Sequence, residues 1–371
     1  MSWCPLAEKL LEVPGELVRT AVDLELTEGT VIADRMGEIP CVFLAGLYRA
    51  ERTVAERLTR LVNGTLPWPW IDPAKALPWV EKRIGIILAE SQVGAVRLAL
   101  MSKVLVMTGG PGVGKTTIVK AILRILAAKE VRLLLCAPTG RAAKRMSEAT
   151  GFDAKTIHRL LEVDPRGGGF KRGDDNPLDC DLLVVDEASM VDVMLMQALL
   201  KAVPDKAAIL IVGDIDQLPS VGPGQVLADI IASGAVPVVR LTEVFRQAAQ
   251  SRIITSAHRI NQGSMPDLSS PSQGDSYFVQ ADDPEIAVPR IIELVKTRIP
   301  KRFGLDPVRD IQVLCPMNRG GVGARSLNIE LQAALNPAGE RKVERFGVYR
   351  RHARQKAGCA GRPEEGGGHR G

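Results

Sequence analysis

The sequence predicts an α/β domain in which a parallel sheet is covered by helices on both faces. Between residues 103 and 246, short apolar runs rich in Val, Ile and Leu alternate with helical segments. Such continuous apolar strands are typical of parallel sheets that are buried on both sides. A glycine-rich loop directly follows the first run, which is a second sign of this fold class. The strands are expected at residues 104–108, 132–137, 182–186, 208–213 and 236–241.

The bulk composition is that of an ordinary globular protein. The 371 residues are 46% hydrophobic and 25% charged, and this length suggests two or three domains. No stretch reaches the ~18 consecutive apolar residues that a membrane span needs, and the first residues lack the pattern of a secretory signal. We therefore expect a cytoplasmic protein with no membrane partner.

Neither the cysteines nor the net charge identifies a ligand. The six cysteines are scattered and form no Cys-x-x-Cys pair, so a zinc or iron–sulfur site is not expected. The formal charge is +5, but residues 350–371 hold six Lys or Arg against two Glu and so supply +4 of it. A case for nucleic-acid binding must therefore rest on local residues and not on the overall charge.

Residues 1–75 form the first predicted domain. Two short helices are expected near residues 7–11 and 16–24. Apolar residues at 31–33 and 41–44 flank a polar turn, which predicts a two-stranded ribbon. This order of elements indicates a small helical, winged-helix-like domain. A scaffold domain that makes no contact with DNA is an equally good interpretation.

Three further parts are predicted after this domain. Residues 76–262 hold the alternating strands and helices, and residues 263–349 open on a polar stretch before a new apolar strand near 310–316. Residues 350–371 are rich in Arg and Gly and poor in apolar side chains. Such a segment cannot bury enough surface to offset the entropy of ordering, so we expect disorder there.

The glycine-rich loop has the pattern G-x-x-x-x-G-K-[ST] of a P-loop NTPase, with an apolar strand before it and a helix after it. Its backbone N–H groups can wrap phosphates, and the positive end of the helix dipole favours them. Lys115 is expected to contact the β- and γ-phosphates of ATP, and the Thr116 hydroxyl to ligate Mg²⁺. A chance glycine-rich turn is the alternative, which the flanking elements disfavour. The expected nucleotide-binding residues of the loop are Gly109, Gly110, Pro111, Gly112, Val113, Gly114, Lys115, Thr116 and Thr117.

Two carboxylates end the apolar run at 182–186. Because the carboxyl ends of parallel strands form one edge of the sheet, Asp186 and Glu187 are expected to point toward bound ligand. Asp186 would hold Mg²⁺ through water, and Glu187 would polarise the attacking water. Acidic residues at this place can also cap the next helix, but a phosphate loop upstream favours the catalytic interpretation.

Two more candidates follow later strands. Gln217 comes shortly after the run at 208–213, where its amide could sense the γ-phosphate. Arg246 follows the run at 236–241, where a guanidinium could neutralise charge in the transition state. A surface ion pair is the simpler interpretation of Arg246 taken alone.

Six segments now resemble, in order and spacing, the successive motifs of superfamily-one DNA helicases. The sequences A-P-T-G-R-A-A, T-I-H-R-L-L and D-E-A-S-M resemble the RecD branch in particular, which includes the alpha subunit of exodeoxyribonuclease V. The resemblance covers about residues 80–335. The six segments are residues 109–117, 136–143, 156–160, 186–190, 213–220 and 241–247.

The resemblance implies a RecA-like ATPase lobe and an ATP-dependent helicase that moves 5′→3′ on single-stranded DNA in recombination and repair. It also implies that Gln92 reads the adenine base. Contacts with the DNA strand would come from phosphate-positioning residues that do not read sequence. The resemblance assigns this role to Pro138, Thr139, Gly140, Arg141, Thr156 and His158.

Residues 310–336 resemble the opening of the family's second RecA-like lobe, and the likeness ends near residue 349. The resemblance thus implies a chain truncated at both ends, with an incomplete second lobe and impaired hydrolysis and unwinding. We hypothesise that the residues after about 349 are the product of a reading-frame shift, because the composition changes abruptly there.

Two alternatives to a working helicase stay open. The chain could be an inactive fragment that binds ATP and DNA, or a subunit of a larger recombination nuclease complex with other subunits as partners. A P-loop switch of another kind would need an arginine-bearing helical lid after the core, and the helicase motifs argue against it.

Overall fold

The computed structural model describes residues 3–165, 167–243, 250–269, 274–336 and 349–350. The chain divides into two compact units, Met1–Ser276 and Tyr277–Gly371. Each unit is described by itself below. The division into four parts that the sequence suggests stays a prediction.

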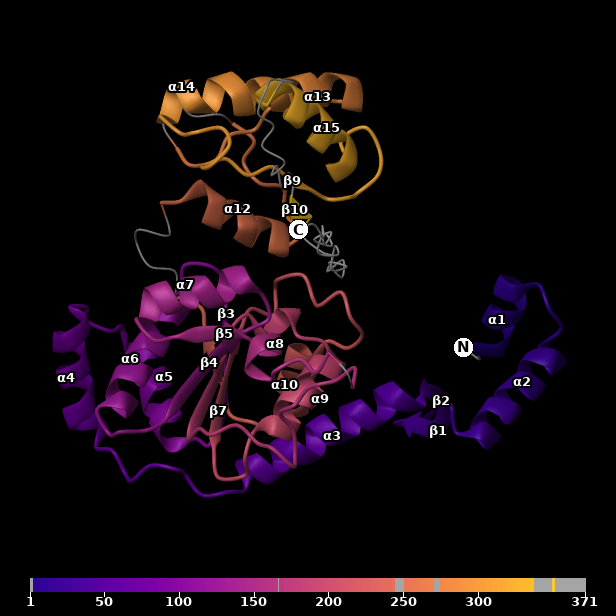
Figure 1. Ribbon diagram of the computed structural model, residues 1–371, viewed down its shortest axis with the longest axis vertical. Helices are drawn as coiled ribbons and strands as arrows, with labels where there is room; N and C mark the ends of the chain where they lie inside the picture. The colour runs from indigo at the N-terminus through magenta and orange to yellow at the C-terminus, as the bar shows by residue number, and fades with distance from the viewer. Residues whose placement is uncertain (1–2, 166, 244–249, 270–273, 337–348, 351–371) are drawn as a thin grey trace, which may run out of the picture. The chain divides into compact units, whose positions relative to one another are not determined.

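A six-stranded sheet is the centre of the first unit (Figure 1). The strand order is β5-β4-β6-β7-β3-β8, and every neighbouring pair is parallel. The predicted α/β class with a parallel sheet is therefore confirmed. The strands are β3 (Val104–Gly109), β4 (Leu133–Ala137), β5 (Ala154–Thr156), β6 (Leu182–Val185), β7 (Ala208–Gly213) and β8 (Val238–Leu241).

Alternate residues of the strands feed two separate cores. In β3, Val104 and Val106 belong to one apolar cluster, whereas Leu105 and Met107 belong to the other. This follows from the pleat, because successive side chains of a strand point to opposite faces. The strands read as unbroken apolar runs because both faces are covered.

Helices cover each face of the sheet. On one face lie α4 (Pro73–Ile84), α5 (Glu90–Met101), α6 (Lys115–Ala127) and α7 (Gly140–Thr150). On the other lie α3 (Ala45–Val62), the short α8 (Ile157–Leu160), α9 (Val193–Ala202) and α10 (Val226–Ser233). Three layers of this kind are the arrangement that the sequence predicts.

The edge strand β5 was not predicted from the sequence. Its three residues, Ala154, Lys155 and Thr156, contain no apolar run, and they pair with β4 alone. Only the pairing along the edge makes this short segment a strand. The five predicted strands are all present, with ends that differ by a few residues at most.

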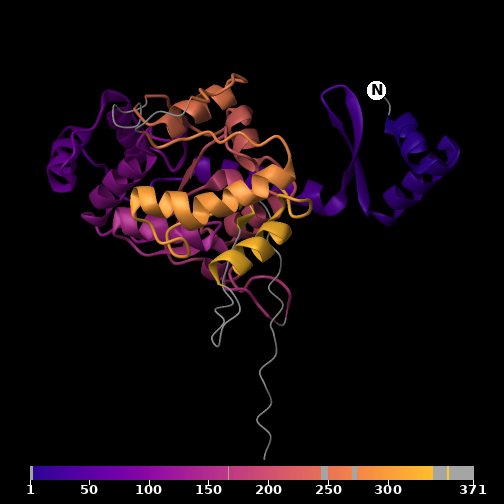
Figure 2. The same cartoon turned by 90° about the horizontal axis from the view of Figure 1, so that it is seen from above.

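The N-terminal elements follow the predicted order. Helices α1 (Trp3–Leu11) and α2 (Gly15–Glu28) precede an antiparallel ribbon of β1 (Val31–Met36) and β2 (Ile39–Leu44). The long helix α3 leads from this ribbon to the sheet domain, and the ribbon lies at its far end in both views (Figures 1 and 2). Helix α3 therefore joins the N-terminal elements to the sheet domain.

Apolar packing and a buried guanidinium hold α3 in place. Val54, Leu58 and Leu61 of α3 are buried in the same cluster as α9. The Arg57 side chain, 14% exposed, is paired with Asp205 at 3.1 Å and with Asp174. It also donates to the Lys201 carbonyl oxygen at 3.2 Å.

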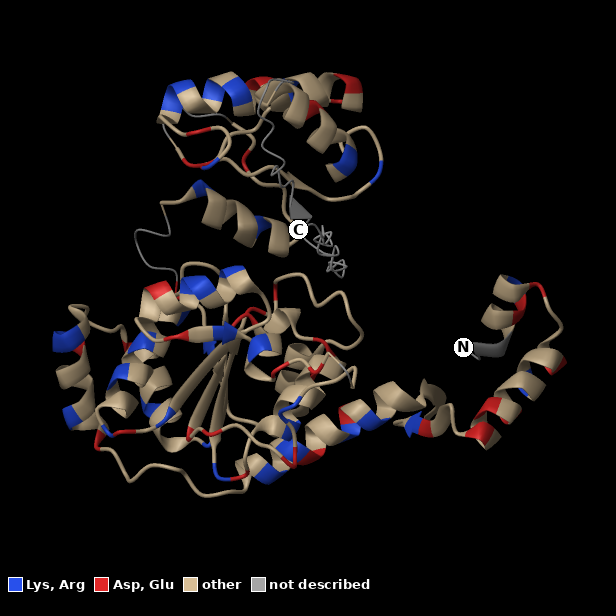
Figure 3. Ribbon diagram, in the orientation of Figure 1, with Lys and Arg blue, Asp and Glu red and all other residues tan. Residues whose placement is uncertain are grey.

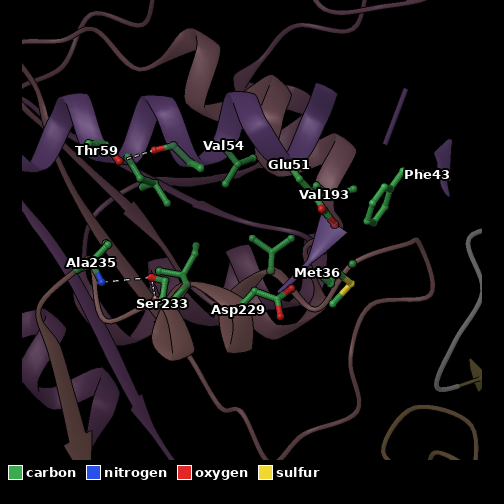
Figure 4. Close-up of a pocket in the computed structure, with 15 residues that line it drawn as sticks. Met36, Phe43, Glu51, Val54, Thr59, Val193, Asp229, Ser233 and Ala235 are labelled. Carbon is green, nitrogen blue, oxygen red and sulfur yellow. Dashed lines mark hydrogen bonds between the residues drawn. The ribbon is translucent and has the colours of Figure 1, made fainter. Parts of the chain in front are cut away.

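A pocket of about 430 Å³ lies between α3, the ribbon and α10; we call it the α3 pocket (Figure 4). Its walls are mostly apolar, with Glu51 and Asp229 among the few charged side chains. The lining residues are Met36, Phe43, Glu51, Val54, Ala55, Leu58, Thr59, Val193, Gly224, Val226, Asp229, Ile230, Ser233, Ala235 and Val236.

The second unit has a small core of its own. Helix α13 (Pro284–Glu293) continues through a π-helical stretch, η2 (Leu294–Arg298), into α14 (Ile299–Phe303). A parallel pair, β9 (Leu314–Cys315) and β10 (Tyr349–Arg350), and helix α15 (Ala324–Leu335) complete its described elements. Among the described residues, its apolar core consists of Val295, Cys315, Ala324, Leu327 and Leu331.

The part of the chain that the structure describes contains no helix long and apolar enough to span a membrane. Disorder was predicted for residues 350–371; this is wrong for Arg350, which lies in β10 and pairs with Cys315 of β9, and residues 351–371 lie outside the described ranges.

Candidate functional site

Strand β3 ends in the glycine-rich loop, and α6 begins at its lysine, Lys115. The loop can turn this sharply because Gly112 and Gly114 have φ values of 80° and 81°, a conformation that residues with a Cβ rarely adopt. The loop therefore sits at the N-terminus of a 13-residue helix, where free N–H groups and the helix dipole favour an anion.

The ammonium group of Lys115 folds back over the loop. Its Nζ donates to the carbonyl oxygens of Gly109 and Gly110, the latter at 3.0 Å. Both acceptors belong to the loop itself. The positive charge is thus held at the place where the loop would surround phosphate groups.

A hollow of about 530 Å³ opens over this loop; we call it the phosphate cleft. It brings together residues that are far apart in the sequence, because the loop and the two predicted carboxylates follow parallel strands of one sheet. The lining residues are Gly110, Pro111, Gly112, Val113, Gly114, Lys115, Thr116, Ala142, Arg145, Met146, Ala149, Asp186, Glu187 and Gln217.

Both carboxylates of the cleft hold protons more tightly than usual. Burial raises the pKa of Asp186, although the Glu187 N–H, Lys115 and Arg145 partly oppose this. Burial also raises the pKa of Glu187, and the charges of Asp186 and Asp214 add to the effect. Such perturbed carboxyl groups in a cleft are typical of functional sites.

The backbone at Glu187 has an uncommon conformation. Its φ of 52° and ψ of 41° lie in the left-handed region, which costs a non-glycine residue about 1 kcal/mol or more. Its N–H donates to Asp186 Oδ1 at 2.9 Å, and the 3₁₀ turn η1 (Ala188–Met190) starts directly after it. The turn ends β6 abruptly and leaves both carboxylates at the cleft.

Gln217 lies in the cleft at the end of a tightly bonded turn after β7. Its Nε2 donates to Asp214 Oδ2 at 3.3 Å, and the other oxygen of Asp214 accepts from the Asp216 N–H at 3.1 Å. Asp214 itself is buried. The amide of Gln217 is therefore positioned by a buried carboxylate.

Gln92 lies outside the lining of the phosphate cleft, in the first turn of α5. Its side chain is buried, and its Oε1 accepts a hydrogen bond from the Ala89 N–H at 3.1 Å. This bond fixes the orientation of the amide. The neighbouring Ser91 Oγ donates to Glu243 Oε2 at 2.7 Å, so that the start of α5 is joined to the chain after β8.

The residues that the family resemblance assigns to DNA lie at the ends of β4 and β5. Thr139 Oγ1 accepts from the Ala142 N–H and caps α7, while Thr156 Oγ1 accepts from the Arg159 N–H and caps α8, both at 3.2 Å. A methyl group on Gly140 would lie 4.0 Å from Thr156 Cγ2. These residues therefore form one group, although capping alone would explain the two threonines.

The other predicted DNA residues extend this group. The His158 ring meets the Phe170 ring edge-on at 5.6 Å. Pro138 and Arg141 flank the Thr139 cap in the sequence. Lys and Arg occur together with Glu along α4 and α7, whereas α6 carries basic residues and no acidic ones (Figure 3). The assignment of Pro138, Arg141 and His158 to DNA stays a prediction.

Two site residues need separate mention. Arg246 lies outside the described residues, so its predicted role stays a prediction. The sequence did not predict Arg145 as a site residue, yet it lines the phosphate cleft, and its charge opposes part of the rise in the pKa of Asp186 and Glu187. The only sequence signal is its spacing, four residues after Arg141 and therefore on the same face of α7.

Comparison with known proteins gives consistent matches. A family model described as an AAA domain matches residues 92–223. The ATP-dependent RecD2 DNA helicase of Deinococcus radiodurans is 37% identical over 298 residues, which is 80% of this chain and 39% of that protein. The RecD subunit of the RecBCD enzyme of Mycolicibacterium smegmatis is 33% identical over 326 residues, which is 79% of this chain and 57% of that subunit.

Solved helicase structures are also similar. The Pif1 helicase from Candida albicans aligns with a TM-score of 0.39 at 21% identity, over 63% of this chain and 66% of that one.

The chain spans less than two thirds of the length of the two sequence relatives, RecD2 and the RecD subunit. Over about four fifths of its own length, this chain is similar to RecD-type helicases.

Proposed function

We propose that this chain binds and hydrolyses ATP and couples hydrolysis to 5′→3′ movement on single-stranded DNA, as a RecD-type helicase of recombination and repair. One observation carries the proposal: a single cleft holds the phosphate loop with Lys115, two carboxylates of raised pKa and Gln217. Neither a capping turn nor a chance glycine-rich loop would assemble these groups.

The phosphate loop supplies binding. The N–H groups at the start of α6 and its dipole attract the phosphates, and Lys115 neutralises charge on the β- and γ-phosphates. Lys115 already lies against the loop through Gly109 and Gly110, so little reorganisation is needed. Gln92, whose amide orientation is fixed, is the proposed reader of the adenine base.

Thr116 and Asp186 both line the cleft, and they offer a hydroxyl and a carboxylate. Oxygen donors of this kind suit Mg²⁺, which keeps several water ligands and needs few from the protein. The ion would neutralise charge that develops on the phosphates. Thr116 would ligate it directly, and Asp186 would do so through water.

Glu187 is the proposed base that orients the attacking water. Its raised pKa makes it a better proton acceptor than an ordinary glutamate. Gln217, tethered to Asp214, would detect the γ-phosphate. Arg246 is the proposed arginine that stabilises charge in the transition state.

Single-stranded DNA is the proposed partner of the surface at the ends of β4 and β5. Thr139, Gly140 and Thr156 lie together there, and Pro138, Arg141 and His158 adjoin them in the sequence. Backbone N–H groups and hydroxyls at helix starts contact phosphates without reading base sequence. Binding through this surface would therefore be independent of sequence.

The second candidate function is that of a non-catalytic ATP- and DNA-binding fragment or subunit. One observation favours a subunit: the relative from M. smegmatis is named as a subunit of the RecBCD enzyme. Other subunits of a recombination complex would then be its partners.

ATP hydrolysis with and without single-stranded DNA, compared with Lys115→Ala, tests the proposal. A helicase ATPase hydrolyses ATP faster when DNA is present, and Lys115→Ala abolishes that turnover. If the chain binds ATP and DNA but hydrolyses nothing, the second candidate holds. If it binds neither, both candidates fail.

A further inference from the structure

His258, which does not line the phosphate cleft, lies against Gly110 of the glycine-rich loop. His258 lies on helix α12 (Arg252–Asn261), which belongs to the first unit. A methyl group added to Gly110 would lie 3.0 Å from His258 Cε1 and 3.8 Å from each ring nitrogen. The imidazole therefore covers the Cα side of Gly110, where no larger residue would fit without a shift.

The other side of the same peptide faces Lys115. The carbonyl oxygen of Gly110 accepts from Lys115 Nζ at 3.0 Å, and that of Gly109 accepts from it too. His258 and Lys115 thus contact one loop residue from two directions. The position of the imidazole and the position of the ammonium group are linked through Gly110.

Nothing about α12 suggests that His258 is an ordinary core residue. No residue of this helix is buried, although His258 Nε2 itself is shielded from solvent and has no hydrogen-bond partner among the described residues. A shielded nitrogen without a partner is uncommon. The contact with Gly110 is therefore the interaction of His258 from which a role can be argued.

Helix α12 is tied to the segment that leads toward the second unit. Ser251 Oγ donates to Asp275 Oδ2 at 2.5 Å, and the Arg252 N–H donates to Asp275 Oδ1 at 2.9 Å. Arg252 also pairs with Asp267 at 2.8 Å. A displacement of Asp267 or Asp275 would therefore move α12, and with it the imidazole that contacts Gly110.

We infer that His258 is a positioning residue for the phosphate loop. It holds the Gly110 peptide so that its carbonyl oxygen stays on Lys115, and it passes movement of α12 to that lysine. The inference rests on the proposed ATP-binding function of the loop. His258 acts on the nucleotide only through Gly110 and Lys115.

A double-mutant cycle on Gly110 and His258 tests this inference. The φ of Gly110 lies outside the left-handed region, so alanine suits the backbone and only the imidazole stands in its way. Gly110→Ala should weaken binding of ATP and Mg²⁺ about tenfold, and His258→Ala alone about threefold, within the range of measured pair couplings. In the double variant the new methyl group occupies the vacated space, so binding should recover to within about threefold of wild type.

Gly109→Ala is the matched control. A methyl group there would lie 2.5 Å from the backbone oxygen of Leu241, which His258→Ala cannot remove. Its defect should therefore persist in the His258→Ala background. Melting temperatures identify any variant that fails to fold, and for those His258→Ala alone still tests the loop through the Kd of ATP.

Equal effects of Gly110→Ala with and without His258 would overturn the inference, as would an unchanged Kd for His258→Ala. Failure of the proposed function looks different. In that case the wild-type chain does not bind ATP, or Lys115→Ala leaves its binding intact.

Discussion

Two hollows of similar volume in the first unit differ in the chemistry of the residues that line them. The phosphate cleft, about 530 Å³, is lined by a glycine-rich loop, Lys115 and carboxylates of raised pKa. The α3 pocket, about 430 Å³, is lined mostly by apolar side chains, and six of its lining residues belong to the apolar core that α3 shares with α9 and α10. The comparison teaches that a hollow becomes a candidate site through the chemistry of its lining.

The physical reason lies in how each hollow is built. Parallel strands deliver the loop and Asp186 to one edge of the sheet, where helix starts offer unpaired N–H groups. The α3 pocket instead forms where a helix and a ribbon meet the outer face of the fold. We therefore expect substitutions in the cleft to change activity, and substitutions in the α3 pocket to change stability.

The largest effect is expected for Glu187→Gln. Loss of the base should lower kcat for ATP hydrolysis about a hundredfold or more, while the Kd of ATP changes little because Lys115 and the loop remain. Steady-state and single-turnover kinetics with single-stranded DNA measure both quantities. An unchanged kcat would remove Glu187 from the proposed mechanism.

Leu58→Ala tests the opposite side of the comparison. Leu58 is buried on α3 and lines the α3 pocket, so its truncation should lower the free energy of unfolding by about 2–5 kcal/mol. The Kd of ATP should stay unchanged. Denaturant unfolding and nucleotide titration give the two values.

Leu24→Ala on α2 is the control for this variant. Its side chain is 59% exposed, so it should have little effect on stability. If Leu58→Ala weakened ATP binding in chains that remain folded, the expectation that the α3 pocket affects only stability would be contradicted.

The pH dependence of stability sharpens the comparison further. Burial raises the pKa of Glu187 in the folded chain, so the folded state binds this proton more tightly than the unfolded state does. Stability therefore falls as pH rises through the range between the ordinary and the raised pKa. Without nucleotide, Glu187→Gln should melt above wild type at neutral pH, and this advantage should vanish at pH values below the ordinary glutamate pKa.

Thermal melting across that pH range measures the difference. A pH-independent difference at Glu187 would mean that the burial of its charge is not what destabilises the site.

The smallest effect is expected where α3 is fastened to the sheet domain. Arg57→Ala removes contacts with Asp205, Asp174 and the Lys201 carbonyl. Both aspartates are more than half exposed, so solvent screening limits the loss of stability to about 1 kcal/mol. Arg60, itself 60% exposed and 3.6 Å from Asp205, is the matched residue. Arg60→Ala should have no measurable effect in the same unfolding experiment, and equal losses would contradict the role of Arg57.

Local sequence pattern predicted most of the sheet because β3, β6 and β7 are unbroken apolar runs that no solvent face interrupts. It could not predict β5, because Ala154–Thr156 becomes a strand only through its pairing with β4. The order β5-β4-β6-β7-β3-β8 also depends on contacts between distant segments.

The candidate site likewise contains residues that the local sequence pattern predicts and residues that only the packing of distant segments reveals. Lys115, Asp186, Glu187 and Gln217 were expected together because each follows an apolar strand, and the structure brings them into one cleft. Arg145 faces that cleft only because of the way α7 packs on the sheet. His258 is a single residue of an exposed helix, and no local pattern marks its contact with Gly110.

Calorimetric titration of ATP with Mg²⁺, on the wild-type chain and on Lys115→Ala, tests the central claim most directly. If the phosphate cleft is the nucleotide site, the wild-type chain binds one ATP and Lys115→Ala weakens that binding by about tenfold or more, because a charge-assisted contact to the phosphates is lost. Equal binding by the two chains, or no binding by either, would contradict the account.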